Sequence, residues 1–156
     1  MPNWCENTAT FRKTDAEQIA ALAKQFSAKE GEPFAFLRPQ PDPLPAAEKT
    51  YIITRNGYGV ESKIETSLPD WYQWRLNNWG TKWEPCACEI IEQEPNELTV
   101  RFDTAWGPPI ALYDYLHENG WDIEADYVEY GLGFAGAYRD GVDESWDYQA
   151  DGEDAA

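Results

Sequence analysis

The sequence lacks any run of about 18 apolar residues, the minimum for a helix that crosses a membrane. Its start, "MPNWCENTATF", also lacks the basic segment and apolar stretch that mark a signal peptide. We therefore expect a protein that stays in the cytoplasm of the cell that makes it and has no membrane partner.

Basic residues are scarce, with 12 lysines and arginines against 29 acids, for a net charge of −17. From Asp114 to the end, Arg139 is the only base among 13 acids. Such a surface repels nucleic acid and membranes and attracts basic partners. The alternative is that the charge only keeps the protein in solution.

Cysteine and histidine are also few. Three cysteines, an odd number, argue against the disulfide framework of a secreted protein. On a predicted strand, Cys86 and Cys88 alternate and share one face, so that with Cys5 and His117 they could form a zinc site. The C-x-C spacing lacks a C-x-x-C pair, and whether these four residues lie near each other is open. We expect no metal and no cofactor.

Known catalytic motifs are missing as well: there is no G-x-S-x-G, no P-loop and no H-E-x-x-H. We expect no enzymatic activity and assign no catalytic residue.

The chain is nonetheless rich enough in hydrophobic residues, at 42%, and aromatic residues, at 15%, to fold. The first half predicts a strand over residues 1–11, then a helix with Thr14 as N-cap and Glu17 completing a capping box. A proline-rich loop follows over 32–50, with "FAFLRP" as a short extended piece. Residues 51–66 are partly extended with a turn at 57–59, and a second helix runs from the N-cap Ser67 to about Trp79.

The second half predicts two strands, "CACEIIEQE" and "ELTVRFDTA", joined at "EPNE". The helix "PPIALYDYLHENG" and the strands "WDIEADYVEY" and "LGFAGAY" follow, and the acidic tail from Asp140 is expected to fray. Without an insertion at about 32–80 the order is βαββαβ, which predicts an α+β ferredoxin-like fold. It has two helices on one face of an antiparallel sheet and an extra C-terminal strand. We expect one domain over 1–148 and a flexible acidic tail over 149–156.

Half of the eight tryptophans lie in "WYQWRLNNWGTKW", residues 71–83. On a helix, one wide face is covered by Trp71, Tyr72, Trp74, Leu76 and Trp79, which favours a packed core. The alternative is a stacking surface for bases or sugars, which would also need a positive groove.

Four segments carry a resemblance: "MPNWCEN", "WYQWRLNNWGTKW", "FDTAWGPP" and "YVEYGLGFAGAY". In this order they resemble the YubB-type or Api-type family of phage- and plasmid-encoded proteins. This chain departs from the family where "FRKTD" lacks a glycine closing the first strand, and where Gly107 replaces the serine before the paired prolines. The resemblance implies a ferredoxin-like fold and an origin on a mobile element, and it implies no activity.

The acidic second half leads to a hypothesis about function. On a strand, Asp122, Glu124 and Asp126 share one face about 6.7 Å apart, while Trp121, Ile123, Ala125 and Tyr127 share the other. Rows of carboxylates at this spacing can imitate a nucleic acid backbone. We therefore expect a DNA mimic that binds a basic host protein, such as a nuclease, a defence complex or a DNA-binding protein. The alternative is a module that binds RNA or single-stranded DNA on its sheet face, because "YGLGFAGAY" weakly resembles the signature strand of such modules. Tyr130 and Leu132 depart from that signature. The expected partner-binding residues are Asp122, Glu124, Asp126, Asp140, Asp143, Glu144 and Asp147.

Overall fold

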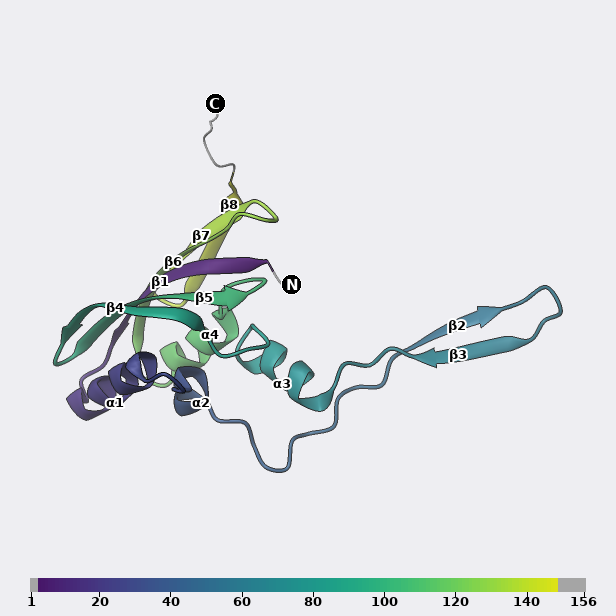
Figure 1. The fold of residues 1–156 in the computed structure, drawn as a ribbon, viewed down its shortest axis with the longest axis horizontal. Coiled ribbons are helices and arrows are strands. Elements are labelled where there is room, and N and C mark those ends of the chain that lie inside the picture. Colours follow the sequence, from purple (N-terminus) through teal and green to yellow (C-terminus); the bar gives the residue numbers. More distant parts are fainter. Residues whose placement is uncertain (1–2, 149–156) are drawn as a thin grey trace.

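The structure is a computed structural model that describes residues 3–148, and its main feature is a six-stranded antiparallel sheet (Figure 1). The strand order is β4-β5-β1-β6-β7-β8. A separate two-stranded sheet, β2-β3, projects on a long arm. The strands are β1 (Trp4–Arg12), β2 (Tyr51–Arg55), β3 (Glu61–Glu65), β4 (Cys86–Glu94), β5 (Glu97–Ala105), β6 (Asp122–Glu129), β7 (Phe134–Arg139) and β8 (Val142–Asp147).

The helices lie on one side of the large sheet (Figure 1). They are α1 (Ala16–Ser27), α2 (Pro33–Leu37), α3 (Asp70–Asn78) and α4 (Ile110–Glu118). In β1, β5 and β6, alternate residues are buried, because successive side chains of a strand point to opposite faces. The expected mixed α+β class is confirmed. Within residues 3–148, no helix is long and apolar enough to cross a membrane.

The core between sheet and helices is aromatic. Phe102 of β5 lies 5.5 Å from Phe26 of α1 and 5.9 Å from Phe34 of α2, between ring centroids. Phe34 in turn lies 5.8 Å from Trp79. Tilted and edge-on rings at these distances add to the free energy gained from burial alone.

The tryptophan-rich segment contributes only some of its rings to the core. Trp79 is 1% exposed, and Trp74 packs against the core. Trp71, Leu76 and Trp83 are 37–38% exposed, and α3 itself contains no buried residue. The prediction of a packed face was right for Trp74 and Trp79 and wrong for Trp71 and Leu76.

Both predicted helix caps were displaced. The N-cap of α1 is Asp15, whose carboxylate accepts a hydrogen bond from the Glu17 backbone N–H at 3.0 Å. Thr14 instead belongs to the connection from β1, where its carbonyl accepts from the Asn96 side chain. The Ser67 hydroxyl accepts from the Thr50 backbone N–H across the base of the arm, so α3 begins three residues later.

The "FAFLRP" segment is helical rather than extended, and it forms α2. Its first amides, those of Phe34 and Ala35, donate to the carboxylate of Glu84 at 2.8 and 2.9 Å. A helix this short depends on such partners for its unpaired amides. Because Glu84 lies 50 residues away in the sequence, local pattern could not predict it.

The acidic tail also differs from expectation, because residues 142–147 form strand β8 instead of fraying. Asp140 and Gly141, both with positive φ (51° and 79°), form the turn from β7 to β8. Two central residues with positive φ are typical of a tight hairpin turn, and Asp-Gly is a strong sequence signal for one. The expected flexible segment 149–156 lies outside the described residues.

Candidate functional site

The side of the six-stranded sheet opposite the helices is called here the open face. It carries the residues that alternate with the buried ones along each strand. The arginines of the open face are Arg12, Arg101 and Arg139. Its acidic residues, called here the acidic set, are Glu6, Glu89, Glu92, Glu94, Glu97, Asp103, Asp122, Glu124, Asp126 and Glu144.

The predicted row on β6 has the expected alternation. Ile123 and Ala125 are buried at 1% each, whereas Asp122 and Asp126 are exposed and Glu124 is half-buried. Glu144 of β8 joins them on the open face, because β7 Ala137 pairs with both Asp126 and Glu144.

The other predicted partner-binding residues lie elsewhere. Asp143 accepts a hydrogen bond from the Tyr127 hydroxyl at 2.6 Å on the helix side of the sheet. Asp147 pairs with Phe134, on that same side, and Asp140 sits in the β7–β8 turn. The structure therefore brings four of the seven predicted residues together on the open face.

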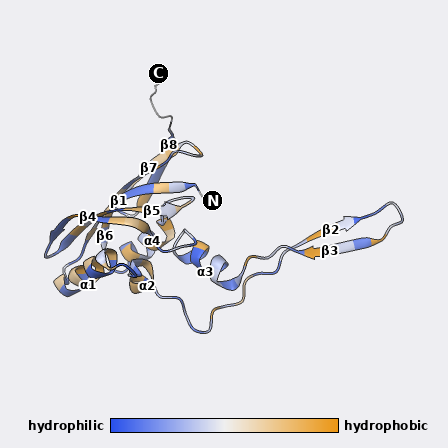
Figure 2. Ribbon diagram, in the orientation of Figure 1, coloured by the Kyte–Doolittle hydropathy of each residue, from blue (hydrophilic) through white to orange (hydrophobic). Residues whose placement is uncertain are grey.

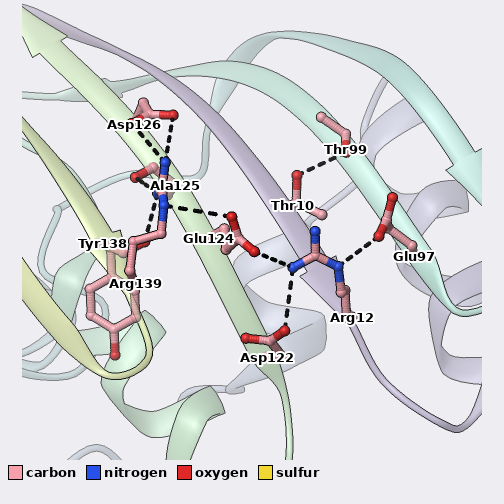
Figure 3. Close-up of polar contacts among 10 residues, drawn as sticks. All are labelled: Thr10, Arg12, Glu97, Thr99, Asp122, Glu124, Ala125, Asp126, Tyr138 and Arg139. Carbon is pink, nitrogen blue, oxygen red and sulfur yellow. Dashed lines mark hydrogen bonds and ion pairs between the residues drawn. The ribbon is translucent and has the colours of Figure 1, made fainter.

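Two arginines hold the β6 carboxylates in place (Figure 3). Arg12 contacts Glu97 at 2.6 Å, Glu124 at 2.7 Å and Asp122 at 3.3 Å. Its hydrogen bonds to Glu97 and Glu124 keep the pKa of the guanidinium above its ordinary value.

Arg139 completes this network from β7. It lies 3.5 Å from Glu124 and 3.2 Å from Asp126, and it also donates to the Ala125 carbonyl. The row is thus rigid and partly neutralised, so the negative charge of the open face depends on other acids as well.

The structure adds acids that sequence reasoning missed. Glu6 and Asp103 face each other across β1 and β5. Burial, and secondarily the charge of Glu6, raise the pKa of Asp103. On β4, Glu89, Glu92 and Glu94 extend the acidic set to the sheet edge. Only strand pairing, with the register shift between Ile90 and Glu92, places these acids on the same face as the β6 row.

The proposed grouping of cysteines with His117 finds no support in the described part of the chain, which holds no cluster of three or more potential metal ligands. The prediction that Cys86 and Cys88 share a face is wrong. Ala87 has a φ of 52° and sits in a bulge, where the register with β5 shifts. As a result Cys86 is exposed opposite Asp103, whereas Cys88 packs against the core.

A protein that binds nucleic acid on its sheet face would need aromatic side chains that stack on nucleobases, and basic side chains, at the centre of the sheet. The central open-face positions are Thr8 and Thr10 on β1 and Thr99 and Arg101 on β5. The segment "YGLGFAGAY" leads into β7, away from this centre. The rings of the open face gather instead at one end of the sheet.

No family model matches this sequence, and no curated protein does. The fold is similar to the crystal structure of protein api92 from Yersinia pseudotuberculosis, which is assigned to the family model DUF1281. The two are 12% identical, the TM-score is 0.52, and the match covers 96% of this chain and 99% of that chain. At this identity the likeness concerns the fold alone, and over nearly its whole length the chain is therefore similar in fold to an api92 protein.

Proposed function

We propose that this chain is a non-enzymatic binding protein that holds a basic partner protein on its open face. The observation that carries the proposal is the acidic set itself, which spreads over five strands of a face without helices. Neighbouring strands are about 4.8 Å apart, and same-face residues about 6.7 Å apart. Carboxylates on this grid offer a basic surface a charge pattern as dense as that of a nucleic acid backbone.

The partner class that fits is a DNA-binding protein of the host cell, such as a nuclease or a defence complex. A protein carried by a phage or plasmid would gain by occupying the DNA-binding surface of such an enzyme in the host cytoplasm. The sequence resemblance to YubB-type or Api-type proteins supports this origin.

The scaffold supports the same proposal. In the chain, α1 lies between β1 and β4, and α4 lies between β5 and β6. In space, β5 lies between β4 and β1. We propose that this order is ferredoxin-like. The helices cover one face of the sheet, and the other face carries no helix of the described residues (Figure 1).

The test uses acids of the open face that form no ion pair within residues 3–148. In one variant, Glu89, Glu92 and Glu144 change to Gln and Asp103 to Asn, which leaves the contacts of Arg12 and Arg139 intact. The control changes Glu17, Glu30, Glu48 and Glu118 to Gln, which removes the same charge away from the open face.

Each protein is used to capture partners from a nuclease-treated bacterial lysate, and bound protein is eluted with salt. We expect the wild type and the control to retain one DNA-binding protein that the open-face variant loses. Double-stranded DNA should displace this partner from the wild type. Equal retention by the two variants would show that the open face does not bind, and a partner that DNA cannot displace would exclude mimicry.

A further inference from the structure

The buried polar side chains of the described residues gather at the end of the large sheet where β1 begins, near the N mark in Figure 1. They are Asn7, Thr81, Thr104 and Glu129, each at most 1% exposed. Burying a polar group is unfavourable unless it is hydrogen-bonded. Thr81, Thr104 and Glu129 hold the backbone of two turns, and Asn7 donates to the Thr104 hydroxyl. These turns display aromatic rings.

The first turn is Ala105–Gly107, in which the Gly107 N–H donates to the Ala105 carbonyl at 2.9 Å. Its central residue, Trp106, has a φ of 70°. A three-residue turn with positive φ at its centre is rare and strained. A bulky side chain is an unusual choice for such a position.

Several hydrogen bonds impose this turn. The Thr81 hydroxyl donates to the Ala105 carbonyl at 2.9 Å, and the Thr104 hydroxyl donates to the Gly107 carbonyl at 2.6 Å. The Asn7 side chain donates to the Thr104 hydroxyl at 2.9 Å. The result is a tryptophan ring that remains 44% exposed.

The second turn follows β6 and is held by Glu129. Its carboxylate accepts from the backbone N–H groups of Gly131 and Leu132. This turn presents Tyr130, which is 51% exposed. Asn3 lies between the two turns: its carbonyl accepts from the Trp106 N–H at 2.7 Å, and its side chain lies against Gly131.

A third ring, that of Trp4, borders the acidic set. Trp4 begins β1 on the open face, two residues before Glu6, and its ring centroid is 6.1 Å from that of Trp83. Glu6 lies opposite Asp103 on the neighbouring strand, and Arg101 of this chain contacts the Glu6 carboxylate at 3.7 Å, so these acids already attract a guanidinium. Lys82 places its ammonium 4.3 Å from the centroid of the Trp83 ring, so a cation over an aromatic face already occurs beside Trp4.

We infer that Trp106, Tyr130 and Trp4, with Glu6 and Asp103, form a preorganised site for an arginine side chain of the basic partner. A guanidinium stacks on aromatic faces and bonds carboxylates in a fork, and a lysine ammonium does this less well. Exposed tryptophan and tyrosine on rigid backbone are also typical centres of binding energy in interfaces. The inference rests on the proposed function, because it takes the partner to be a basic protein.

The test uses two synthetic peptides of equal length and charge, one alternating arginine with glycine and the other lysine with glycine. Binding is followed by titration at low salt, with NMR of the tryptophan indole N–H groups to locate it. We expect the arginine peptide to bind more tightly and to shift the Trp106 signal. Trp106→Gly and Tyr130→Ala should each weaken its binding about two- to fivefold and weaken lysine-peptide binding less.

Trp106→Gly also separates binding from folding, because glycine suits the positive φ at this position. It should keep the melting temperature while losing affinity. The matched control for Tyr130→Ala is Tyr58→Ala, at the tip of the arm, where the side chain is 95% exposed.

The outcomes distinguish the two proposals. If neither peptide binds the wild type, the proposed function fails and this inference fails with it. If both peptides bind equally and only the open-face variant loses them, the proposed function stands and the arginine site is wrong. A large loss of stability in Trp106→Gly would show that the ring serves packing and would overturn the inference.

Discussion

At the residue scale, Cys5 shows how burial couples stability to pH. It is fully buried, and burial raises the pKa of its thiol from 9.0 to about 12. The unfolded chain releases this proton near pH 9 while the folded chain keeps it, so the stabilisation is complete below pH 9 and is lost as pH rises. We expect the free energy of unfolding to fall by about 1 kcal/mol between pH 9 and 10 from this thiol alone.

Urea unfolding of wild type and Cys5→Ala at several pH values checks this prediction. The variant should lose less stability between pH 9 and 10. Cys86 provides the comparison. Burial raises the pKa of its thiol as well, so Cys86→Ala should depart from the wild type in the same direction as Cys5→Ala but by less. Above pH 10 all curves should fall further, because burial also raises the pKa of Tyr138. Parallel curves for Cys5→Ala and wild type would contradict the prediction.

At the element scale, helix α2 illustrates dependence on a distant residue. Its first amides bond to Glu84, while Glu32, the residue at its own N-cap, makes no side-chain bond. We expect Glu84→Ala to lower the free energy of unfolding by about 1–2 kcal/mol, as the loss of a helix cap does. The amides of Phe34 and Ala35 should also exchange faster with deuterium. Glu32→Ala should leave both quantities nearly unchanged, and equal effects of the two substitutions would refute the assignment.

At the scale of the whole molecule, the arm stands apart from the large sheet (Figures 1 and 2). All residues of β2 and β3 are exposed, including Ile52 at 55% and Ile64 at 59%, which face each other across the hairpin. A lone two-stranded hairpin is marginally stable in water. Replacing residues 48–66 by a short glycine-serine linker should therefore change the melting temperature by only about 1–3 °C, since loop length affects stability weakly.

Calorimetry of the shortened protein measures this, and the buried Ile123 provides the contrast. Ile123→Ala should cost about 2–5 kcal/mol and lower the melting temperature by many degrees. A shortened protein that fails to fold would show that the arm contributes to the stability of the large sheet.

Long periodic elements were predictable because their signals are local. The alternation in "WDIEADYVEY" predicted β6, with its buried and exposed sides, and the paired prolines and Asn119-Gly120 bounded the helix that is α4. The β7–β8 turn was also predictable, from Asp140-Gly141, but the acidic composition of the tail obscured it. Two features could not be found this way: α2, which needs Glu84, and the bulge at Ala87, which separates Cys86 from Cys88.

The sequence by itself determined the α+β class, most strands and helices and the excess of acid, because periodicity, turn residues and charge are properties of neighbouring positions. Only the tertiary structure decided which acids share a face, since that depends on the pairing of strands far apart in the chain. It also decided that Arg12 and Arg139 hold the β6 row. Finally, it brought residues near 4, 81, 106 and 130 to one end of the sheet, where buried hydrogen bonds fix exposed rings.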